Sequence, residues 1–248
     1  LLDAHPTAVR LAPRGVLSAV AGAVKLTPLI FGVHYLARRQ HRAVITMGVT
    51  FVASALIALV LLYEPSVRYW TGALFDVGRI GDPARKISQS ITSVLGRAGV
   101  PHGVMRMVWP LIALVVAGWA FYVVRCCIDT GRWLHAVVVV GCAGVLISPI
   151  SWPHHQIWPV LGIPLLLAAP ARWAKALALV ALPFFLFNHI RFADFVDGVF
   201  GEVSRVPGRL LVEGRVILMV AMIAAFSRAA LAKAPQERPA APLAHAET

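Results

Sequence analysis

Acidic residues are scarce in this chain. It holds 11 Asp plus Glu against 23 Lys plus Arg in 248 residues, with a formal net charge of +12. In a soluble protein this balance would suggest a nucleic-acid partner. Hydrophobic residues make up 59% of the chain, however, whereas soluble domains are about 45–50% apolar. Because the basic residues fall mostly between apolar runs, as topology signals do, we expect a membrane protein and no nucleic-acid binding.

Cysteine is also scarce, and its spacing argues against a disulfide or metal framework. Cys126 and Cys127 are adjacent, and Cys142 lies within an apolar run, so there is no CxxC pair. A glycine-rich phosphate loop is missing too. We therefore expect no metal site and no cofactor, and we interpret the three cysteines as small apolar core residues.

Long apolar runs, by contrast, are abundant. A membrane helix needs about 20 predominantly apolar residues. The candidate runs are 15–37, 43–63, 104–124, 133–150, 157–169, 173–190 and 210–231. They predict an all-α, polytopic membrane protein with six to seven transmembrane or re-entrant helices, which form one membrane domain over residues 1–231.

The basic residues near the run ends predict the orientation. Basic segments occur at 37–43, 125–132, 171–175 and from Arg228 onward, and they share one side if the spans alternate. We expect that side to be cytoplasmic. The loops 64–103, 148–156 and 191–209 then lie on the extracytoplasmic side of the cell membrane.

Two segments outside the apolar runs have a recognisable character. In the outer loop 64–103, Tyr69, Trp70, Leu74 and Phe75, and then Ile87, Ile91 and Leu95, follow helical spacing and predict two short interfacial helices. Residues 232–248 are rich in Ala and Pro and have no apolar face, which predicts a disordered cytoplasmic tail.

The first apolar run contains Lys25 and Pro28 near its centre, and basic residues flank both of its ends. A proline interrupts a straight helix, so a re-entrant pair of half-helices is one solution. An ionisable group at this depth is costly and needs a partner. Lys25 either binds a phosphate in an internal cavity, or reaches an interface or a carboxylate elsewhere.

A second unusual stretch, SPISWPHHQIWP at 148–159, joins two apolar runs. Its prolines limit helix formation around His154 and His155. An imidazole can donate a hydrogen bond to a phosphate oxygen or transfer a proton near neutral pH. A capping role is the alternative, in which the histidines only hydrogen-bond the backbone at the junction.

Four segments together carry a family resemblance. They are AGAVKLTPLIF at 21–31, SVRYWTGALFDVGRIGDP at 66–83, SQSITSVLGR at 88–97 and SPISWPHHQIWP at 148–159. In this order and spacing they resemble the actinobacterial polyprenyl-phosphate-mannose-dependent mannosyltransferases of glycosyltransferase family 87, the group that includes the phosphatidylinositol-mannoside type. The resemblance covers roughly residues 10–225.

The resemblance implies a GT-C-like membrane enzyme without a cofactor. Such an enzyme moves a hexose, here expected to be mannose, from a polyprenyl-phosphate donor to a glycolipid or glycan acceptor on the extracytoplasmic side. It implies Lys25, Gln89, His154 and His155 as candidates for the donor phosphate and sugar site. The chain departs from the family pattern at Ser88, where Asn is usual, and at Pro153, where a polar residue is common.

The general base is not among these candidates. In enzymes of this class the catalytic acid typically lies in the first outer loop, so we expect it N-terminal to this chain, which we interpret as the C-terminal part of a longer enzyme. Two alternatives remain at this stage. A transporter or flippase could use Lys25 in a substrate path, and a noncatalytic membrane assembly subunit could hold the same helices.

Overall fold

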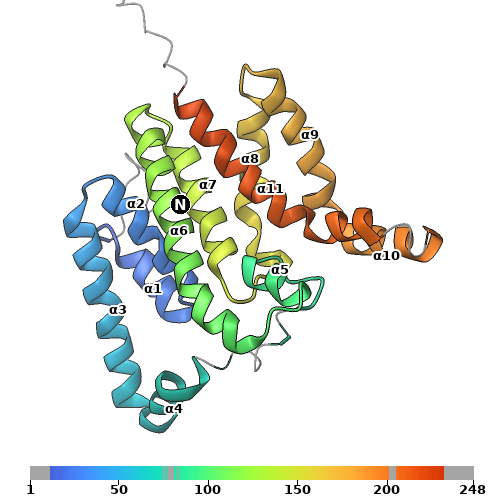
Figure 1. The fold of residues 1–248 in the computed structure, drawn as a ribbon. Coiled ribbons are helices and arrows are strands. Elements are labelled where there is room, and N and C mark those ends of the chain that lie inside the picture. The colour runs from blue at the N-terminus through green and yellow to red at the C-terminus, as the bar shows by residue number, and fades with distance from the viewer. Residues whose placement is uncertain (1–11, 75, 77–80, 83, 201–204, 232–248) are drawn as a thin grey trace, which may run out of the picture.

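The computed structural model describes residues 12–74, 76, 81–82, 84–200 and 205–231. Within these residues the chain forms helices and no strand (Figure 1). The helices are α1 (Val16–Val24), α2 (Phe31–Ala37), α3 (His41–Leu61), α4 (Tyr63–Arg68), α5 (Ile91–Arg97), α6 (His102–Asp129), α7 (Trp133–Ile147), α8 (Ile157–Leu167), α9 (Arg172–Leu186), α10 (His189–Phe200) and α11 (Arg205–Leu231). Short 3₁₀ turns at Thr27–Ile30 and Pro153–His155 precede α2 and α8. The predicted all-α class is confirmed.

Several helices are apolar and long enough to cross a membrane. These are His41–Leu61, His102–Asp129 and Gly208–Arg228, and a fourth candidate combines α9 with His189–Val196 across a bend of 89°. The segments Thr27–Ala37, Trp133–Ile147 and Ile157–Leu167 are shorter apolar helices. The chain is therefore a multi-pass membrane protein, and the six to seven membrane segments stay a prediction.

The first apolar run folds back on itself as a helical hairpin. α1 ends at Val24, because the extended backbone of the next residue, Lys25 (φ −153°, ψ 126°), cannot continue a helix. At the open end of the hairpin the hydroxyl groups of Ser18 and Tyr35 are 2.9 Å apart, and a Cβ atom on Gly15 would lie 2.3 Å from the Ala43 carbonyl oxygen at the start of α3. Both ends of the run therefore lie on one side, which explains why basic residues flank both of them.

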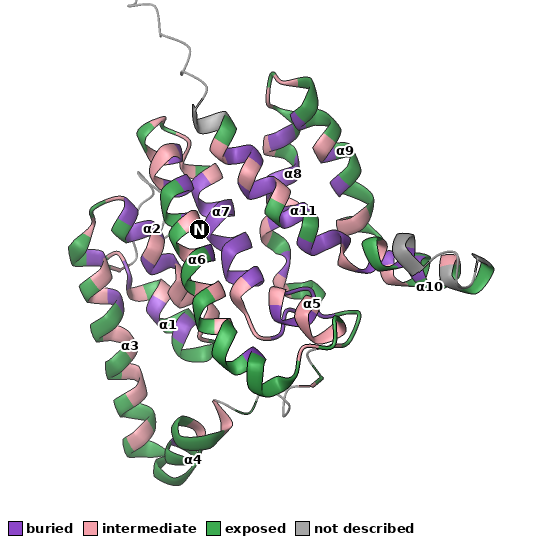
Figure 2. Ribbon diagram, in the orientation of Figure 1, coloured by how far each residue is buried: buried purple, intermediate pink, exposed green. Residues whose placement is uncertain are grey.

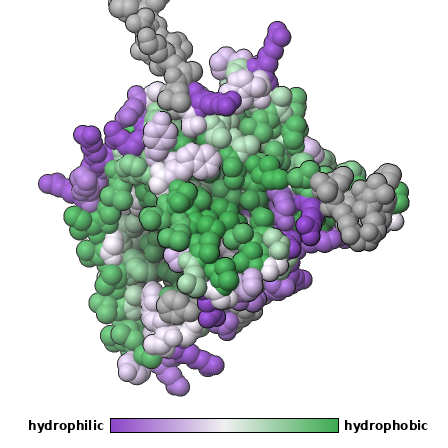
Figure 3. Space-filling view, viewed as in Figure 1, coloured by the Kyte–Doolittle hydropathy of each residue, from purple (hydrophilic) through white to green (hydrophobic). Residues whose placement is uncertain are grey.

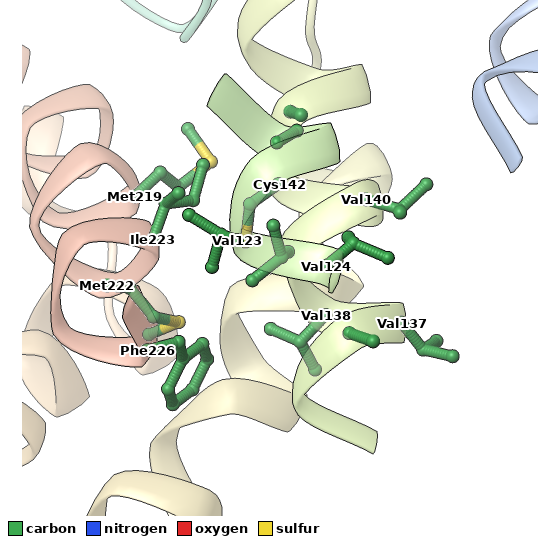
Figure 4. Packing of buried hydrophobic residues seen from close by; sticks show 14 of the residues in the cluster. Val123, Val124, Val137, Val138, Val140, Cys142, Met219, Met222, Ile223 and Phe226 are labelled. Carbon is green, nitrogen blue, oxygen red and sulfur yellow. The ribbon is translucent and has the colours of Figure 1, made fainter. Parts of the chain in front are cut away.

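The core lies between α6, α7 and α11, and its residues are almost all aliphatic. Every residue of α7 from Ala136 to Leu146 is buried. Cys142 lies toward Met219 and Ile223 of α11, whereas Val137 and Val140 point away from α11 (Figure 4). The small side chains of α7 let neighbouring helices approach closely: a Cβ atom on Gly141 would lie 2.1 Å from the Trp158 ring. α7 is thus the central helix against which both the hairpin and α8 pack.

The outer surface is apolar where the core helices face outward. α3 carries only two buried residues, Ala43 and Met47, and Val60 near its end is 81% exposed (Figure 2). In the space-filling view hydrophobic residues cover most of the middle of the face, and hydrophilic residues gather toward its upper and lower ends (Figure 3). This arrangement suits a hydrocarbon layer around the middle of the molecule.

The structure corrects the outer segments in two places. The stretch 191–209 was predicted as a loop, but α10 covers it up to Phe200 and α11 begins at Arg205. The second predicted interfacial helix begins only at Ile91, after Ile87, because the Ser90 hydroxyl caps it by accepting from the Ser93 N–H at 3.2 Å. The predicted tail 232–248 lies outside the described residues.

Candidate functional site

A cavity of about 510 Å³ lies at the tip of the helical hairpin. Its walls come from both halves of the hairpin, from α7 and from the junction between α7 and α8. Three of the four predicted site residues line it, namely Lys25, His154 and His155. Most of the other residues in the wall are apolar or small, including Phe31, Gly141 and Trp158. The rings of Phe31 and Trp158 are 5.3 Å apart, measured between their centroids.

Lys25 reaches this cavity because the hairpin turns at its backbone. The close approach of Gly22 to Leu29 keeps the turn tight, since a Cβ atom at position 22 would lie 2.5 Å from the leucine side chain. Pro28 stands in the first turn of the following 3₁₀ helix, where a missing N–H is tolerated. The break that the sequence suggested thus places the ammonium group at the hairpin tip, where it lines the cavity.

The side chain of His155 contacts Lys25 at the cavity. The hydrogen bond to one ring nitrogen of His155 determines which of its two ring nitrogens carries the proton. The Trp152 backbone N–H donates to Nδ1 of His155 at 3.1 Å, so the neutral ring carries its proton on Nε2. Nε2 is the atom that contacts Nζ of Lys25. Burial, followed by the charge of Lys25 and by His154, lowers the pKa of His155 to about 4. The ring is therefore neutral near pH 7.

This contact brings two hydrogen-bond donors together. A lysine ammonium group has donors only, and Nε2–H is also a donor. The pair is satisfied if the lysine gives up a proton, or if the two groups separate enough to donate to one shared anionic acceptor. No Asp or Glu of the described residues lines the cavity to supply that acceptor. The site can therefore bind an anion such as a phosphate oxygen.

His154 lies beside this pair. Its ring is exposed and stands at 73° to the His155 ring, with 4.1 Å between the ring centroids. The sequence left open whether the histidines cap the backbone or face a cavity, and the structure shows both arrangements at different atoms. Nδ1 of His155 holds the backbone at the junction, whereas Nε2 of His155 and the ring of His154 face the cavity.

Gln89, the fourth predicted residue, lies elsewhere. Its side chain is fully buried, and its amide nitrogen donates to the carbonyl oxygens of Lys86 and Val212, both at 2.8 Å. It reaches the junction only through its backbone, whose N–H donates to the Ser151 carbonyl oxygen at 2.9 Å. The structure thus brings Lys25, His154 and His155 together and leaves Gln89 outside the cavity lining.

The predictions missed a buried arginine behind the junction. Arg215 on α11 is 7% exposed and donates from Nη1 to Oε1 of Gln156, the residue after His155, at 2.9 Å. It also donates to the carbonyl oxygens of Phe184 at 2.7 Å and Phe187 at 3.2 Å, where α9 ends. A charged residue inside the last apolar run was the signal that could have identified it.

The described residues contain no group of three or more His, Cys, Asp or Glu side chains that could hold a metal ion. Cys126, Cys127 and Cys142 are free thiols. The chemistry available at the cavity is thus that of a cation, two imidazoles and hydroxyl groups. Together with the helical fold, it defines a polytopic membrane protein with a cavity that holds a lysine and two histidines.

The chain belongs to glycosyltransferase family 87, whose family model matches residues 1–149. Lys25 and Gln89 lie inside this match, which ends before His154 and His155. No solved structure matches the chain.

Curated relatives come from mycobacteria. The chain is 33% identical over 146 residues, 59% of its length, to a polyprenol-phosphate-mannose-dependent alpha-(1-2)-phosphatidylinositol mannoside mannosyltransferase of Mycobacterium tuberculosis. It is 32% identical over 181 residues, 68% of its length, to the protein of the same name from Mycolicibacterium smegmatis. A pentamannoside mannosyltransferase of Mycobacterium tuberculosis is 34% identical over 163 residues, 64% of the chain. The matched segments span 34%, 41% and 36% of these relatives' own lengths.

Proposed function

We propose that this protein takes part in mannosyl transfer from a polyprenyl-phosphate-mannose donor to a phosphatidylinositol-mannoside type of acceptor. The family membership and the printed names of the mycobacterial relatives support this activity. The observation that carries the proposal is the meeting of Lys25 and His155 in a cavity with no lining carboxylate among the described residues. Neither a transporter nor an assembly subunit is favoured by any observation at this cavity.

The two donors suit the phosphate of the lipid donor. When the bond between the sugar C1 and the phosphate oxygen breaks, the electron pair stays on that oxygen and the phosphate gains negative charge. A cation and an N–H group beside it stabilise the charge as it develops. The acceptor hydroxyl forms the new bond to C1 and loses its proton to a base. No acid of the described residues lines the cavity, so the base remains unassigned in this chain.

The apolar part of the wall suits the rest of the donor. The hairpin contributes Leu17, Ala21 and Phe31 to the lining, and these residues can pack against prenyl units next to the phosphate. Because lipid donors already reside in the bilayer, no separate nucleotide-binding domain is needed. Gln89 enters this proposal only as a support of the junction, through its bond to Ser151.

We place the cavity toward the extracytoplasmic side of the cell membrane. The basic ends of the hairpin and of α6 lie together, since Nη1 of Arg125 donates to the Ala37 carbonyl oxygen at 2.6 Å. Basic loops favour the cytoplasmic side. The histidine junction lies at the other end of α7, fifteen residues away from these loops.

A transfer assay tests the proposal. Membranes from cells that express the complete open reading frame receive labelled polyprenyl-phosphate-mannose and a phosphatidylinositol-mannoside acceptor. We expect Lys25→Ala and His155→Ala to lower kcat/KM on the order of 10- to 100-fold, because each removes a hydrogen bond to a charged group. Lys175→Ala is the matched control, since this exposed lysine on α9 lies outside the cavity lining. Equal transfer by all variants would refute the site, and no mannosyl transfer by the unsubstituted protein would refute the function.

A further inference from the structure

α10 has a buried face and an exposed apolar face. One face, with His189 and Ala193, is buried at 6% and 0% exposure, and α10 packs there against α11. The second face consists of Phe192, Phe195 and Val199, which are 57%, 64% and 58% exposed. At about 100° per residue these three side chains fall within roughly 60° of one another, about a third of a turn from the buried face. Nothing in the described part of the chain covers them.

A third face of the same helix is polar. Asp194 accepts a hydrogen bond from Nζ of Lys86 at 2.6 Å, and both side chains are about half exposed. Gly198 is exposed on this side and a Cβ atom there would meet nothing within 4 Å. Arg191 is exposed and stands between the polar face and the aromatic face. One side of the helix thus packs against the protein, a second side suits contact with an apolar phase, and a third suits contact with water.

The position of α10 identifies the apolar phase. α10 follows α9 after a bend of 89°, and α9 together with His189–Val196 forms one bent candidate span (Figure 1). α9 carries exposed apolar residues such as Leu179 and Leu186. The exposed aromatic face therefore continues a surface that already faces lipid, but on a helix turned across the span. A helix in this position lies along the membrane surface, where aromatic side chains and basic residues are typical.

We propose that α10 lies in the plane of the bilayer surface on the side of the histidine junction. Phe192, Phe195 and Val199 insert at the boundary of the acyl chains, and Arg191 binds the phosphate groups of the lipid head groups. Through the ion pair of Asp194 with Lys86, this helix holds the segment that carries Gln89 at the membrane surface. The partner is the bilayer itself, and the inference does not depend on the transfer reaction.

Spin labels test this placement in the intact protein. A background without native cysteines (Cys126→Ser, Cys127→Ala, Cys142→Ala) receives one new cysteine at a time and is reconstituted in nanodiscs with one protein per disc. Nitroxide labels at Phe192→Cys, Phe195→Cys and Val199→Cys should collide more often with oxygen, which concentrates in the hydrocarbon, than with a water-soluble nickel chelate. Gly198→Cys is the matched control on the polar face, and its label should show the reverse preference.

Two results would overturn the proposal. Labels at 195 and 198 with the same water-like preference would place the aromatic face in water. An immobilised label at 195 that neither relaxant reaches would show that protein covers this face. Both labelled positions are exposed in the fold, so the variants should retain the melting temperature of the cysteine-free background, which is measured beside them. The readout needs no donor or acceptor, so it stays independent of the proposed function.

Discussion

Lys25 and His155 are 130 positions apart in the sequence, and their side-chain nitrogens are in contact at the hairpin tip. Each residue reaches the contact from a helix break, one beside Pro28 and the other in the turn that begins at Pro153. The backbone N–H of Trp152 orients the imidazole so that its proton points at the lysine. The breaks in two apolar runs thus create one polar site.

The lowered pKa of His155 predicts a pH-dependent stability. An unfolded imidazole has a pKa of 6.5, and in the folded protein the pKa falls to about 4. Between these values the unfolded chain binds more protons, so this contribution is full above pH 6.5 and is lost as the pH falls toward 4. His155→Gln cannot titrate, so its melting temperature in detergent should fall less between about pH 7 and pH 4.5 than that of the unsubstituted protein. The exposed His102→Gln is the control, and if its curve also flattened, the effect would not belong to the cavity.

Arg215 should stabilise the end of α9 and the histidine junction together. Arg215→Met leaves three acceptors without their donor, a buried one on Gln156 and partly buried carbonyl oxygens on Phe184 and Phe187. Each lost bond of this kind costs about 1–3 kcal/mol, and we expect a total near 3 kcal/mol after partial rearrangement. Unfolding in mixed micelles measures it, with the exposed Arg228→Met on the same helix as control. Equal stabilities of the two variants would show that these bonds do not hold the junction.

Gly141 should be essential for the wall of the cavity. A Cβ atom there would lie 2.1 Å from the Trp158 ring, so Gly141→Ala must displace the tryptophan or separate α7 from α8. We expect a loss of about 1–3 kcal/mol in stability and weaker donor binding. Gly118→Ala on the neighbouring α6 has nothing within 4 Å of its new Cβ atom and should be neutral or slightly stabilising. Identical behaviour of the two alanines in unfolding and in binding would contradict the packing.

Gln89 should act through stability rather than through contact with the donor. Gln89→Met removes a buried hydrogen bond to Val212 and a partly buried one to Lys86, and should lower the unfolding free energy by about 1–3 kcal/mol. The affinity of the folded fraction for polyprenyl phosphate should stay within about twofold of the unsubstituted value. A large loss of affinity at unchanged stability would place the Gln89 side chain in the donor site.

Hydrophobic runs predicted most helices within a few residues, because membrane helices need long apolar sequences. The same reasoning missed α10, because its polar and apolar residues are mixed and form no long apolar run. Only the structure shows that these residues lie on different faces of one helix. Lys25 and His155 stood out as costly or unusual residues, but periodicity could not show that they meet, since the contact depends on how the hairpin packs against α7. Arg215 is marked by its charge inside the last apolar run, but its role could not be predicted, because its partners are backbone carbonyl oxygens and one amide and no acidic residue.

The affinity of the protein for polyprenyl phosphate tests most directly whether Lys25 and His155 hold a donor phosphate. The complete protein in nanodiscs is titrated with polyprenyl phosphate, and Lys25→Met is compared with Lys25→Arg and with the control Lys175→Met. We predict that Kd rises at least about 10-fold for Lys25→Met, that Lys25→Arg restores much of the affinity, and that Lys175→Met binds as the unsubstituted protein does. The same Kd for the unsubstituted protein and Lys25→Met would contradict the account.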